Sequence, residues 1–465
     1  MSTFPNPPFE DLMAPEIGPT IGRIQEFVRL QDEKNSAEKA AQFVAETLTQ
    51  LRCNTVEVLP TEGSPVVLGE LNVGAPTTLL AYLMYDTAPV LDKDEWSVPP
   101  YAGEVVDLPS GRAMVARGAL ARRGPLLAFT SAIEALQSAD VPLPVNIVFF
   151  AEGDENEGSP HLVDFVARYR QAFRSCTATF FPSAEQESDG TVALKLGAKG
   201  MLGLEVEVDG ASWTFGSKKD LHWGEAAWVG SPMWRLVHAL GTLASADGSN
   251  VLIEGFYDDV QTPSRADIRM VERIPFSENE TRKRLGISSF VGELSAEDAQ
   301  VRNLFEPSIL LEGVWGSIPP VARLYRRALA RIHFRVVPDQ SLDSIESKTY
   351  SHLVNSGYGE ARVRRIYGVP WSKVSRDEPI VKAATDVYIS LGVRPTLWPL
   401  QPKTPPTAAF GLPYVMAGMG HGGNQASADE YLLLEDRADL KGLPSLMASF
   451  GKILFAFARR SSVET

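Results

Sequence analysis

The chain has 465 residues, a length that allows two or three domains at about 100–200 residues each. Hydrophobic residues make up 44% and charged residues 22% of the sequence, which is typical of globular proteins and excludes a disordered or coiled-coil chain. Lys and Arg number 44 against 58 Asp and Glu, so the formal net charge is −14. We therefore expect no nucleic acid and no anionic membrane as partner.

Two cysteines, Cys53 and Cys176, lie far apart in the sequence and form no CxxC pair. Their spacing excludes a disulfide framework and a thiolate zinc site, and it favours a reducing compartment. The N-terminal segment lacks the basic and apolar runs of a signal peptide, and the longest apolar stretches are too short to span a bilayer. These features predict a cytoplasmic protein.

Strand-like and helix-like patterns alternate along the first 200 residues. The predicted order is a helical stretch at 21–53 that breaks near Asn35 with Ser36 as N-cap, strands at 56–59, 66–71 and 78–86, a helix at 125–137, a strand from 145, a helix at 160–172 and a strand at 177–184. The strands are continuously apolar, which is typical of a sheet covered on both faces. This part of the chain therefore predicts an α/β domain.

The pattern changes after Gly200. Residues 202–208 and 330–337 alternate with period two, as in strands with one solvated face, and 231–246 and 342–356 read as helices, with a strand at 361–366. From Val369 the α/β pattern returns, with a helix at 379–391 and an apolar stretch at 414–420. The simplest division is an α/β domain of residues 1–200 and 369–465, interrupted by an α+β domain of residues 201–368.

Polar residues follow several predicted strands, where catalytic groups of open α/β sheets gather. Asp86 lies at the end of the strand at 78–86, an acidic run at 152–157 lies at the end of the next buried strand, and residues 183–187 lie at the end of a third. His421 lies in a Gly-rich loop, as does His222, and such loops concentrate functional side chains.

Several motifs, taken together and in this order, resemble those of the co-catalytic zinc peptidases, a family that includes carnosine dipeptidase, aminoacylase and succinyl-diaminopimelate desuccinylase. The motifs are LMYDTAP (83–89), DEWSVPPY (94–101), RGALARRGP (117–125), PVNIVFFAEGDENEGSP (144–160), GAKG (197–200), DLHWG (220–224), GFYDDV (255–260) and RVVPDQ (335–340). The resemblance implies a zinc-peptidase-like α/β catalytic domain interrupted by an α+β lid and dimerisation domain. It also implies a homodimer, because His222 resembles a residue that serves the cleft of a second subunit.

The family holds two zinc ions with five side chains, and the resemblance carries these positions to Met84, Ala121, Glu155, Ser183 and His421. Zinc binds imidazole, thiolate or carboxylate, so neither Met84 nor Ala121 replaces the lost ligand. Next to the bridging position the family has a carboxylate, whereas this chain has the cation Arg122. We therefore expect no metal or other cofactor, with one weakly bound zinc on Glu155 and His421 as the alternative.

The resemblance also assigns roles to residues outside the metal site. Asp154 stands at the position of the general base, and Asp86 at that of the Asp that orients the first His. His222 resembles the residue that polarises the substrate carbonyl, and Arg335 the one that clamps the substrate carboxylate. Thr404 lies in the altered loop 402–406, which in the family recognises the substrate terminus.

These residues leave three hypotheses open. The first is a metal-independent enzyme that performs cyclisation, isomerisation, dehydration or acyl transfer on a small amino-acid-like, peptide or amide substrate. The second is a residual hydrolase with one zinc, and the third is a non-catalytic pseudopeptidase that binds such ligands. The predicted catalytic residues are Asp154, Glu155 and His222, and the predicted substrate-binding residues are Arg335, His421, Asp86 and Thr404.

Overall fold

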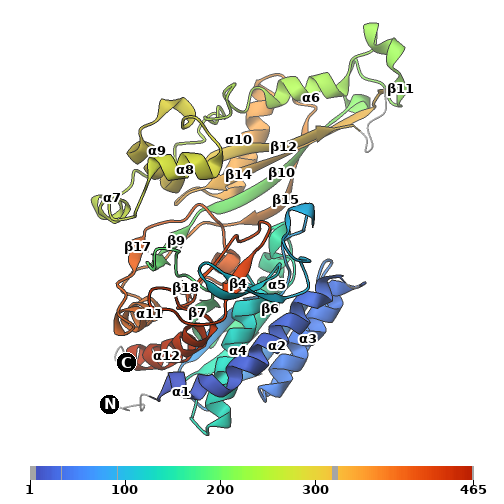
Figure 1. Cartoon of the computed structure of the whole chain (residues 1–465). Coiled ribbons are helices and arrows are strands. Elements are labelled where there is room, and N and C mark those ends of the chain that lie inside the picture. Colours follow the sequence, from blue (N-terminus) through green and yellow to red (C-terminus); the bar gives the residue numbers. More distant parts are fainter. Residues whose placement is uncertain (1–6, 33, 92, 317–322, 463–465) are drawn as a thin grey trace. The chain divides into compact units, whose positions relative to one another are not determined.

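The computed structural model describes residues 7–32, 34–91, 93–316 and 323–462. Its chain forms two compact units (Figure 1). The first unit comprises Met1–Leu196, Val374–Trp398 and Ala409–Thr465, and the second comprises Gly197–Lys373 and Pro399–Ala408. The segment 399–408, which carries Thr404, thus belongs to the second unit, whereas the sequence division assigns it to the α/β domain.

The first unit is built on a six-stranded sheet in the order β1-β2-β6-β3-β7-β18. Strands β3, β6, β7 and β18 run parallel, while β1–β2 and β2–β6 pair antiparallel. Met84 pairs with Glu152, so the carboxyl ends of β3 and β6 share one edge of the sheet. The strands are β1 (Thr55–Leu59), β2 (Val66–Leu71), β3 (Thr78–Met84), β6 (Asn146–Glu152), β7 (Cys176–Pro182) and β18 (Tyr414–Ala417).

Both faces of this sheet are covered, as its apolar strands predict. Neighbouring residues of a strand point to opposite faces, and Phe149 lies against Phe129 of α4 (Arg123–Ser138) while Phe150 lies against Phe165 of α5 (Leu162–Arg168). The α4 face also carries α1 (Phe9–Met13), α2 (Ile17–Arg29), α3 (Ser36–Gln50), α11 (Pro379–Ser390) and α12 (Leu443–Ser461), which Figure 1 shows packed beside one another. Among the described residues, no helix is long and apolar enough to cross a membrane.

Smaller strands complete the first unit and position loops near the sheet edge. A four-stranded sheet has the order β19-β20-β5-β4, and β17 pairs with β8 in parallel. These strands are β4 (Glu104–Leu108), β5 (Gly111–Val115), β8 (Ala193–Lys195), β17 (Thr396–Trp398), β19 (Gly422–Gly423) and β20 (Tyr431–Leu433). Tyr431 pairs with Val115, which places the residue before it, Glu430, beside the segment that starts at Arg117.

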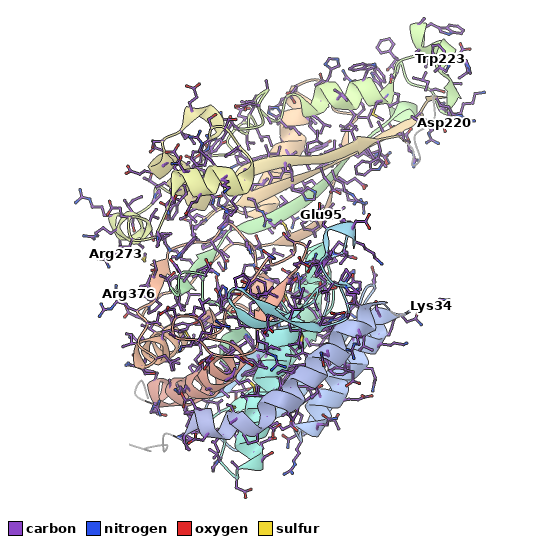
Figure 2. All side chains as sticks on the ribbon, viewed as in Figure 1. Lys34, Glu95, Asp220, Trp223, Arg273 and Arg376 are labelled. Carbon is purple, nitrogen blue, oxygen red and sulfur yellow. The ribbon has the colours of Figure 1, made fainter. Side chains whose placement is uncertain are left out.

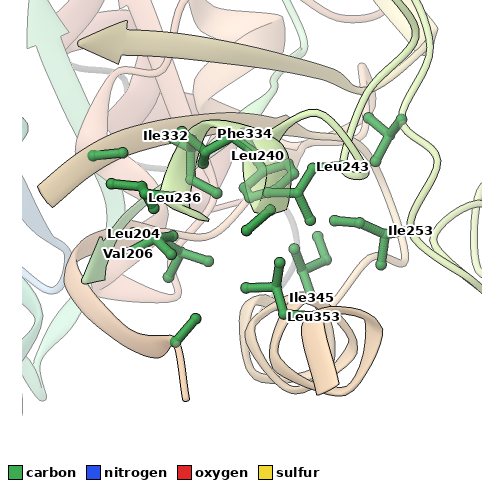
Figure 3. Packing of buried hydrophobic residues seen from close by; sticks show 14 of the residues in the cluster. Leu204, Val206, Leu236, Leu240, Leu243, Ile253, Ile332, Phe334, Ile345 and Leu353 are labelled. Carbon is green, nitrogen blue, oxygen red and sulfur yellow. The ribbon is translucent and has the colours of Figure 1, made fainter. Parts of the chain in front are cut away.

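The second unit contains an antiparallel sheet in the order β12-β14-β10-β15, with one face covered by α6 and α10. Figure 3 shows the apolar side chains of β10 and β14, among them Leu204, Val206, Ile332 and Phe334, gathered against these helices. Alternate residues of β14, such as Arg335, face the other way and stay half-buried. The elements are β10 (Gly200–Asp209), α6 (Pro232–Leu240), β12 (Ser308–Trp315), β14 (Arg327–Val336), α10 (Leu342–Asn355) and β15 (Arg362–Val369).

The remaining elements of the second unit are short. They are β9 (Gly197–Ala198), β11 (Leu221–His222), α7 (Arg265–Val271), α8 (Glu278–Leu285), α9 (Ala296–Phe305), β13 (Arg323–Leu324) and β16 (Ser372–Lys373). Figures 1 and 2 place the β11 segment, with Asp220 and Trp223, at one end of this unit.

Two local predictions were wrong. Ser36 is the first residue of α3, and Asn35 precedes it in a left-handed conformation that makes no side-chain cap. The helix predicted at 231–246 ends at Leu240, because Gly241 is poor at continuing a helix and the chain then turns at 241–243.

Candidate functional site

A charged cluster lies at the carboxyl ends of β3 and β6. Asp86 follows β3, Glu155 lies in the short 3₁₀ turn after β6, and Arg122 immediately precedes α4. The Arg122 guanidinium lies between the two carboxylates: Nε is 3.2 Å from Asp86 Oδ1, and Nη2 donates to Glu155 Oε2. Nη2 also donates to the Asn156 side-chain oxygen at 2.8 Å. One guanidinium therefore joins two carboxylates of different loops.

Burial and the neighbouring opposite charges shift the pKa values of this cluster in opposite directions. The side chains of Arg122 and Asp86 are each 10% exposed and that of Glu155 is 22% exposed. Burial raises the pKa of the Asp86 carboxyl, and Arg122 opposes that shift. Burial alone lowers an arginine pKa, but the carboxylates of Asp86 and Glu155 more than offset this and hold the pKa of Arg122 above its usual value. Arg122 is a permanent cation here.

Arg122 has N–H donors that the contacts of this cluster do not use. Arg122 makes its contacts through Nε and Nη2, and Nη1 makes no hydrogen bond or ion pair with any residue that the structure describes. A guanidinium carries five N–H donors in a planar fork, so two donors on Nη1 are available to a ligand.

Glu152, the last residue of β6, is a buried carboxyl beside this cluster. It is 4% exposed and accepts hydrogen bonds from the Tyr82 hydroxyl and, at 2.9 Å, from the Ser159 hydroxyl. Burial raises the pKa of Glu152 to about 8, which the two hydroxyl donors only partly oppose. The carboxyl is therefore mostly protonated at neutral pH.

Asp154 is hydrogen-bonded to a different loop from the Arg122 cluster. Both of its carboxylate oxygens accept from the backbone N–H of Ser64, at 3.0 and 2.9 Å, in the loop before β2. Gly63 lies close to this carboxylate: a Cβ at residue 63 would lie 2.3 Å from Asp154 Oδ2, so any larger residue would require the Asp154 side chain to move. The sequence-predicted general base is thus held by a loop of the same unit, with lone pairs left for a ligand.

Three positions that the resemblance assigns to zinc ligands carry other chemistry. Met84 is buried in an apolar cluster with Tyr82 and other aromatic side chains. Ala121 contributes only its backbone N–H, which donates to Glu430 Oε1 at 3.1 Å. The Ser183 hydroxyl is buried and makes no hydrogen bond with the part of the chain that the structure describes. None of these groups presents an imidazole or a carboxylate.

His421, the predicted late ligand, is buried and uses both ring nitrogens. Nδ1 lies 2.8 Å from the Gln186 carbonyl oxygen, which can only accept, so Nδ1 carries the proton. Nε2 lies 3.2 Å from the Tyr431 hydroxyl. Within the described residues, no group of three or more His, Cys, Asp or Glu side chains is arranged to hold a metal ion.

The second unit brings two predicted residues together. Arg335 donates from Nη1 to the Thr404 hydroxyl at 2.6 Å, and that hydroxyl donates to the Lys199 carbonyl oxygen at 2.6 Å. The Lys199 ammonium is buried and donates to the Glu306 carbonyl oxygen. Burial, and then the neighbouring charge of Arg335, lower the pKa of Lys199 to about 8. Two cations and a hydroxyl therefore lie in one neighbourhood, an environment that suits a carboxylate.

His222 lies elsewhere in the second unit, at the end of β11. Its Nδ1 accepts from the Gly224 backbone N–H at 3.1 Å, so the neutral ring carries its proton on Nε2. His222 is exposed, and the hydrogen bond of its ring is made within its own turn.

Sequence reasoning missed the part that three residues play in these sites. It marks Arg122 only as unfavourable to a metal, and it does not single out Glu152 or Lys199. The sequence signal for Arg122 is a cation within the motif RGALARRGP. The fold places this motif beside two carboxylates that follow strand ends, Asp86 and Glu155. Glu152 and Lys199 look like ordinary charged residues in the sequence, and only their burial distinguishes them.

Comparison with known proteins gives one consistent result. The family model described as peptidase family M20/M25/M40 matches residues 85–443. A Beta-Ala-His dipeptidase from Rattus norvegicus is 26% identical over 73% of this chain and 68% of its own length, and a Cys-Gly metallodipeptidase from Schizosaccharomyces pombe is 26% identical over 62% and 60%.

The comparison with solved structures agrees with the comparison of sequences. The crystal structure of an M20 family metallo-carboxypeptidase from Sulfolobus solfataricus matches with a TM-score of 0.80 and 26% identity, over 95% of this chain and 99% of that one. The predicted α/β fold of the zinc peptidases is therefore confirmed. On these grounds the chain is a member of peptidase family M20/M25/M40.

Proposed function

We propose that this chain is an enzyme that performs metal-independent acid–base chemistry on an amino-acid-like, peptide or amide substrate. The observation that carries the proposal is the Arg122 guanidinium, ion-paired with Asp86 and Glu155 where the family's motifs place metal chemistry. A fixed guanidinium between these carboxylates supplies N–H donors at the site without a metal ion. Electrostatic stabilisation of developing negative charge is commonly the largest catalytic term, and it needs only a preorganised donor.

The side chains present do not fit a two-zinc centre. Met84, Ala121 and Ser183 offer no zinc ligand, and Arg122 repels a dication and already occupies Glu155. The single-zinc alternative must displace Arg122 from Glu155 and must also free His421 Nε2 from Tyr431. Both requirements weigh against it.

The available groups favour proton transfer over hydrolysis. A metal lowers the pKa of water from 15.7 to about 7, and that activation has no substitute here. Arg122 Nη1 can donate two hydrogen bonds to a carbonyl oxygen, and Asp154 can act as general base. Cyclisation, isomerisation, dehydration and acyl transfer need only such groups. In the second unit, Arg335 and Thr404 suit a carboxylate, and His222 suits a carbonyl oxygen.

We propose that the chain acts as a homodimer through the 201–368 domain. β12 is an edge strand of its sheet, and it exposes Leu310 and Leu311, 63% and 49% respectively. A neighbouring apolar groove of about 540 Å³ is lined by residues of α6, the following loop and β12. An edge strand that pairs antiparallel with its own copy is self-complementary, as a two-fold interface requires.

A reducing compartment, the cytoplasm, is proposed from the cysteines. Cys53 and Cys176 are both unpaired thiols. Burial raises the pKa of each thiol to about 12, so neither is a reactive thiolate. Both are suited to a setting where disulfides do not form.

The test is a turnover screen of dipeptides, N-acyl amino acids and amino-acid amides, followed by mass spectrometry, with and without a zinc chelator. We expect conversion that the chelator does not change and that Asp154→Asn and Arg122→Met abolish. Glu104→Gln, which changes an exposed carboxylate of β4, serves as the matched control and should keep full activity. Chelator-sensitive hydrolysis would favour the single-zinc enzyme, and ligand binding without any conversion would favour the pseudopeptidase.

A further inference from the structure

A Glu–His–Tyr triad, made of Glu312, His333 and Tyr367, lies on the sheet of the second unit. Ile332 and Phe334 of β14 point toward α6 and α10 (Figure 3), so His333 between them lies on the opposite face. His333 Nε2 is 2.6 Å from Glu312 Oε2 of β12, and Nδ1 is hydrogen-bonded to the Tyr367 hydroxyl of β15. The proposed function uses none of these three residues.

Two irregular strands and one glycine bring the triad together. Glu312 is the extra residue of a β-bulge in β12, and a second bulge in β15 directly precedes Tyr367. Gly203 of β10 pairs with both His333 and Tyr367, and a Cβ at this glycine would lie 2.6 Å from the Tyr367 ring. The ring therefore crosses β10 over Gly203 and stacks beside the imidazole, with the two centroids 5.7 Å apart. Bulges that re-aim a side chain are common beside active sites.

The hydrogen bonds of the triad determine where its protons lie. A carboxylate oxygen only accepts, so Nε2–H of the neutral imidazole donates to Glu312, and Nδ1 accepts from the Tyr367 hydroxyl. Burial raises the pKa of Tyr367, so its phenol keeps the proton at neutral pH and reacts only when a base takes it. A hydroxyl, a base at hydrogen-bond distance and a carboxylate that orients the base are the parts of a nucleophilic triad.

The triad is accessible, and a carboxylate-binding residue lies beside it. The side chains of His333 and Glu312 are 20% and 47% exposed, and Tyr367 is half-buried. Arg335 lies two residues after His333 on the same face of β14. Its positive charge opposes the effect of burial on the pKa of Tyr367, so the guanidinium is close enough to act on that hydroxyl.

We propose that Tyr367 is a nucleophile that takes an acyl group from an activated ester or thioester carrying a carboxylate, which Arg335 binds. The Tyr367 oxygen forms a bond to the acyl carbon while its proton passes to His333 Nδ1, and Glu312 stabilises the imidazolium. The bond from the acyl carbon to the leaving oxygen or sulfur breaks with its electron pair on that atom, which then takes the proton from His333. The inference goes beyond the proposed function, because this reaction lies in the second unit and does not use the Arg122 cluster.

Two acetate esters test the triad in the full chain: 4-acetoxybenzoate, which carries a carboxylate, and its methyl ester, which carries none. Mass spectrometry of the digested protein measures acetylation at each tyrosine over time. Tyr350 of α10, which is 48% exposed, reports the background reaction in the same sample. Relative to Tyr350, we expect 4-acetoxybenzoate to acetylate Tyr367 about tenfold faster than the methyl ester does, and Arg335→Ala to remove this difference.

Variants of the triad separate its three roles. His333→Gln removes the base and should slow acetylation of Tyr367 about a hundredfold. Glu312→Gln keeps an acceptor for Nε2–H but loses the charge, and we expect it to slow the reaction more than about tenfold. Tyr367→Phe should abolish the acetylation at this position, and the matched control Tyr350→Phe should leave it unchanged.

The pH dependence of acetylation distinguishes a base from a merely structural histidine. The rate at Tyr367 should level off with rising pH once the imidazole of His333 is neutral, whereas the rate at Tyr350 should keep rising as more of its phenol ionises. The other charged groups that share this sheet face with His333 are Arg331, Arg335 and Glu205.

Three results would overturn the inference: equal acetylation of Tyr367 and Tyr350, a rate at Tyr367 that His333→Gln does not lower, or equal relative rates with the two esters. Thermal unfolding of each variant confirms that it is folded, and Tyr367→Phe keeps the ring that stacks on the imidazole. Because acetylation is measured at Tyr367 itself and needs no turnover of the proposed substrate, its failure beside chelator-resistant conversion would reject the triad and leave the proposed function standing.

Discussion

Two buried clusters, each with one arginine and its carboxylate partners, lie close together in the first unit and differ in what holds them. The carboxylate of Glu430 accepts from Arg117 Nη1 at 2.9 Å and from the backbone N–H groups of Gly118, Leu120 and Ala121, each at 3.1 Å. Arg117 and Glu430 are 3% and 1% exposed, and the Arg117 guanidinium lies over the Trp96 ring. Backbone N–H groups cannot rotate away as side chains can, so this cluster holds the loop of residues 118–121 in place.

The cluster of Arg122, Asp86 and Glu155 is held mainly by side chains, and its members are 10–22% exposed. Arg122 Nη1 makes no contact with a described residue, in contrast to the saturated Glu430 carboxylate. The difference teaches that buried charges can be held in different ways. Arg117 Nε is also buried without a hydrogen-bond partner among the described residues, so unused donors do not separate the two clusters. What separates them is the Glu430 carboxylate, which three backbone N–H groups hold in place.

The largest effect should come from breaking the scaffold. Arg117→Met leaves the Glu430 carboxylate buried without its cation, and we expect a loss of about 3–5 kcal/mol in the free energy of unfolding. Urea denaturation measures the loss. The matched control is Arg112→Met, whose pair with Glu435 is exposed and worth less than about 1 kcal/mol. Equal losses in the two variants would show that the Arg117 pair is no scaffold.

The second-largest effect is expected at Glu152, whose carboxyl makes the free energy of unfolding depend on pH. The pKa of its carboxyl is about 8 in the folded chain, against an ordinary value of 4.5 in the unfolded chain. Between these two values the folded state holds a proton that the unfolded state has lost. Stability therefore falls as the pH rises from 5 to 8, by about 3 kcal/mol from this residue.

Glu152→Gln mimics the protonated carboxyl and should remove that fall. Unfolding free energies of both proteins at pH 5 and pH 8 measure the difference, with the exposed Glu157→Gln as control. An identical pH dependence in wild type and Glu152→Gln would mean that the Glu152 carboxyl is ionised in the folded protein.

A smaller effect on stability is expected at the cluster of Arg122, Asp86 and Glu155. Arg122→Met should cost about 2 kcal/mol of unfolding free energy, because Asp86 can take up a proton when its cation is lost. Turnover should disappear in the same variant. Arg122→Lys keeps the charge but loses the fork, so we expect most of the stability and only partial activity. Full activity in Arg122→Met would remove Arg122 from the site.

The smallest expected change is at Arg335, in the second unit. Arg335→Ala should weaken the binding of carboxylate ligands such as N-acetyl amino acids about tenfold, or roughly 1.4 kcal/mol, measured by calorimetry. Arg331→Ala, on the same strand face, is the matched control. Because the pKa of Lys199 is about 8, the affinity should also fall as the pH rises through 8. An unchanged affinity in Arg335→Ala would exclude it from the ligand site.

Much of the sheet could be predicted from the sequence, because local pattern determines it. Continuous apolar runs predicted β3 and β6, and the residues at their ends include Asp86 and Glu155. The contact between Arg122 and Glu155 spans 33 residues of sequence, and no local pattern reports it. The resemblance located the positions of the site, but it could not say that the cation would pair with the surviving carboxylates.

Other elements were missed. The sequence of α12 carries the 3.6-residue pattern of an amphipathic helix, with a proline in its first turn and Arg459 and Arg460 in its last, and these signals could have predicted it. α7, α8 and α9 are short and largely polar, and their capping serines, such as Ser264 and Ser295, were the signal that could have found them. The raised pKa of Glu152 depends on tertiary burial and has no sequence signature.

The most direct test of the central claim is the zinc content of the purified protein, measured by elemental mass spectrometry after dialysis against trace zinc. We predict close to zero equivalents for the natural chain. The fourfold variant Met84→His, Ala121→Asp, Arg122→Asp and Ser183→Asp restores the family's ligands and should bind zinc. About two equivalents in the natural chain would contradict the claim, because a dication would then share Glu155 with Arg122.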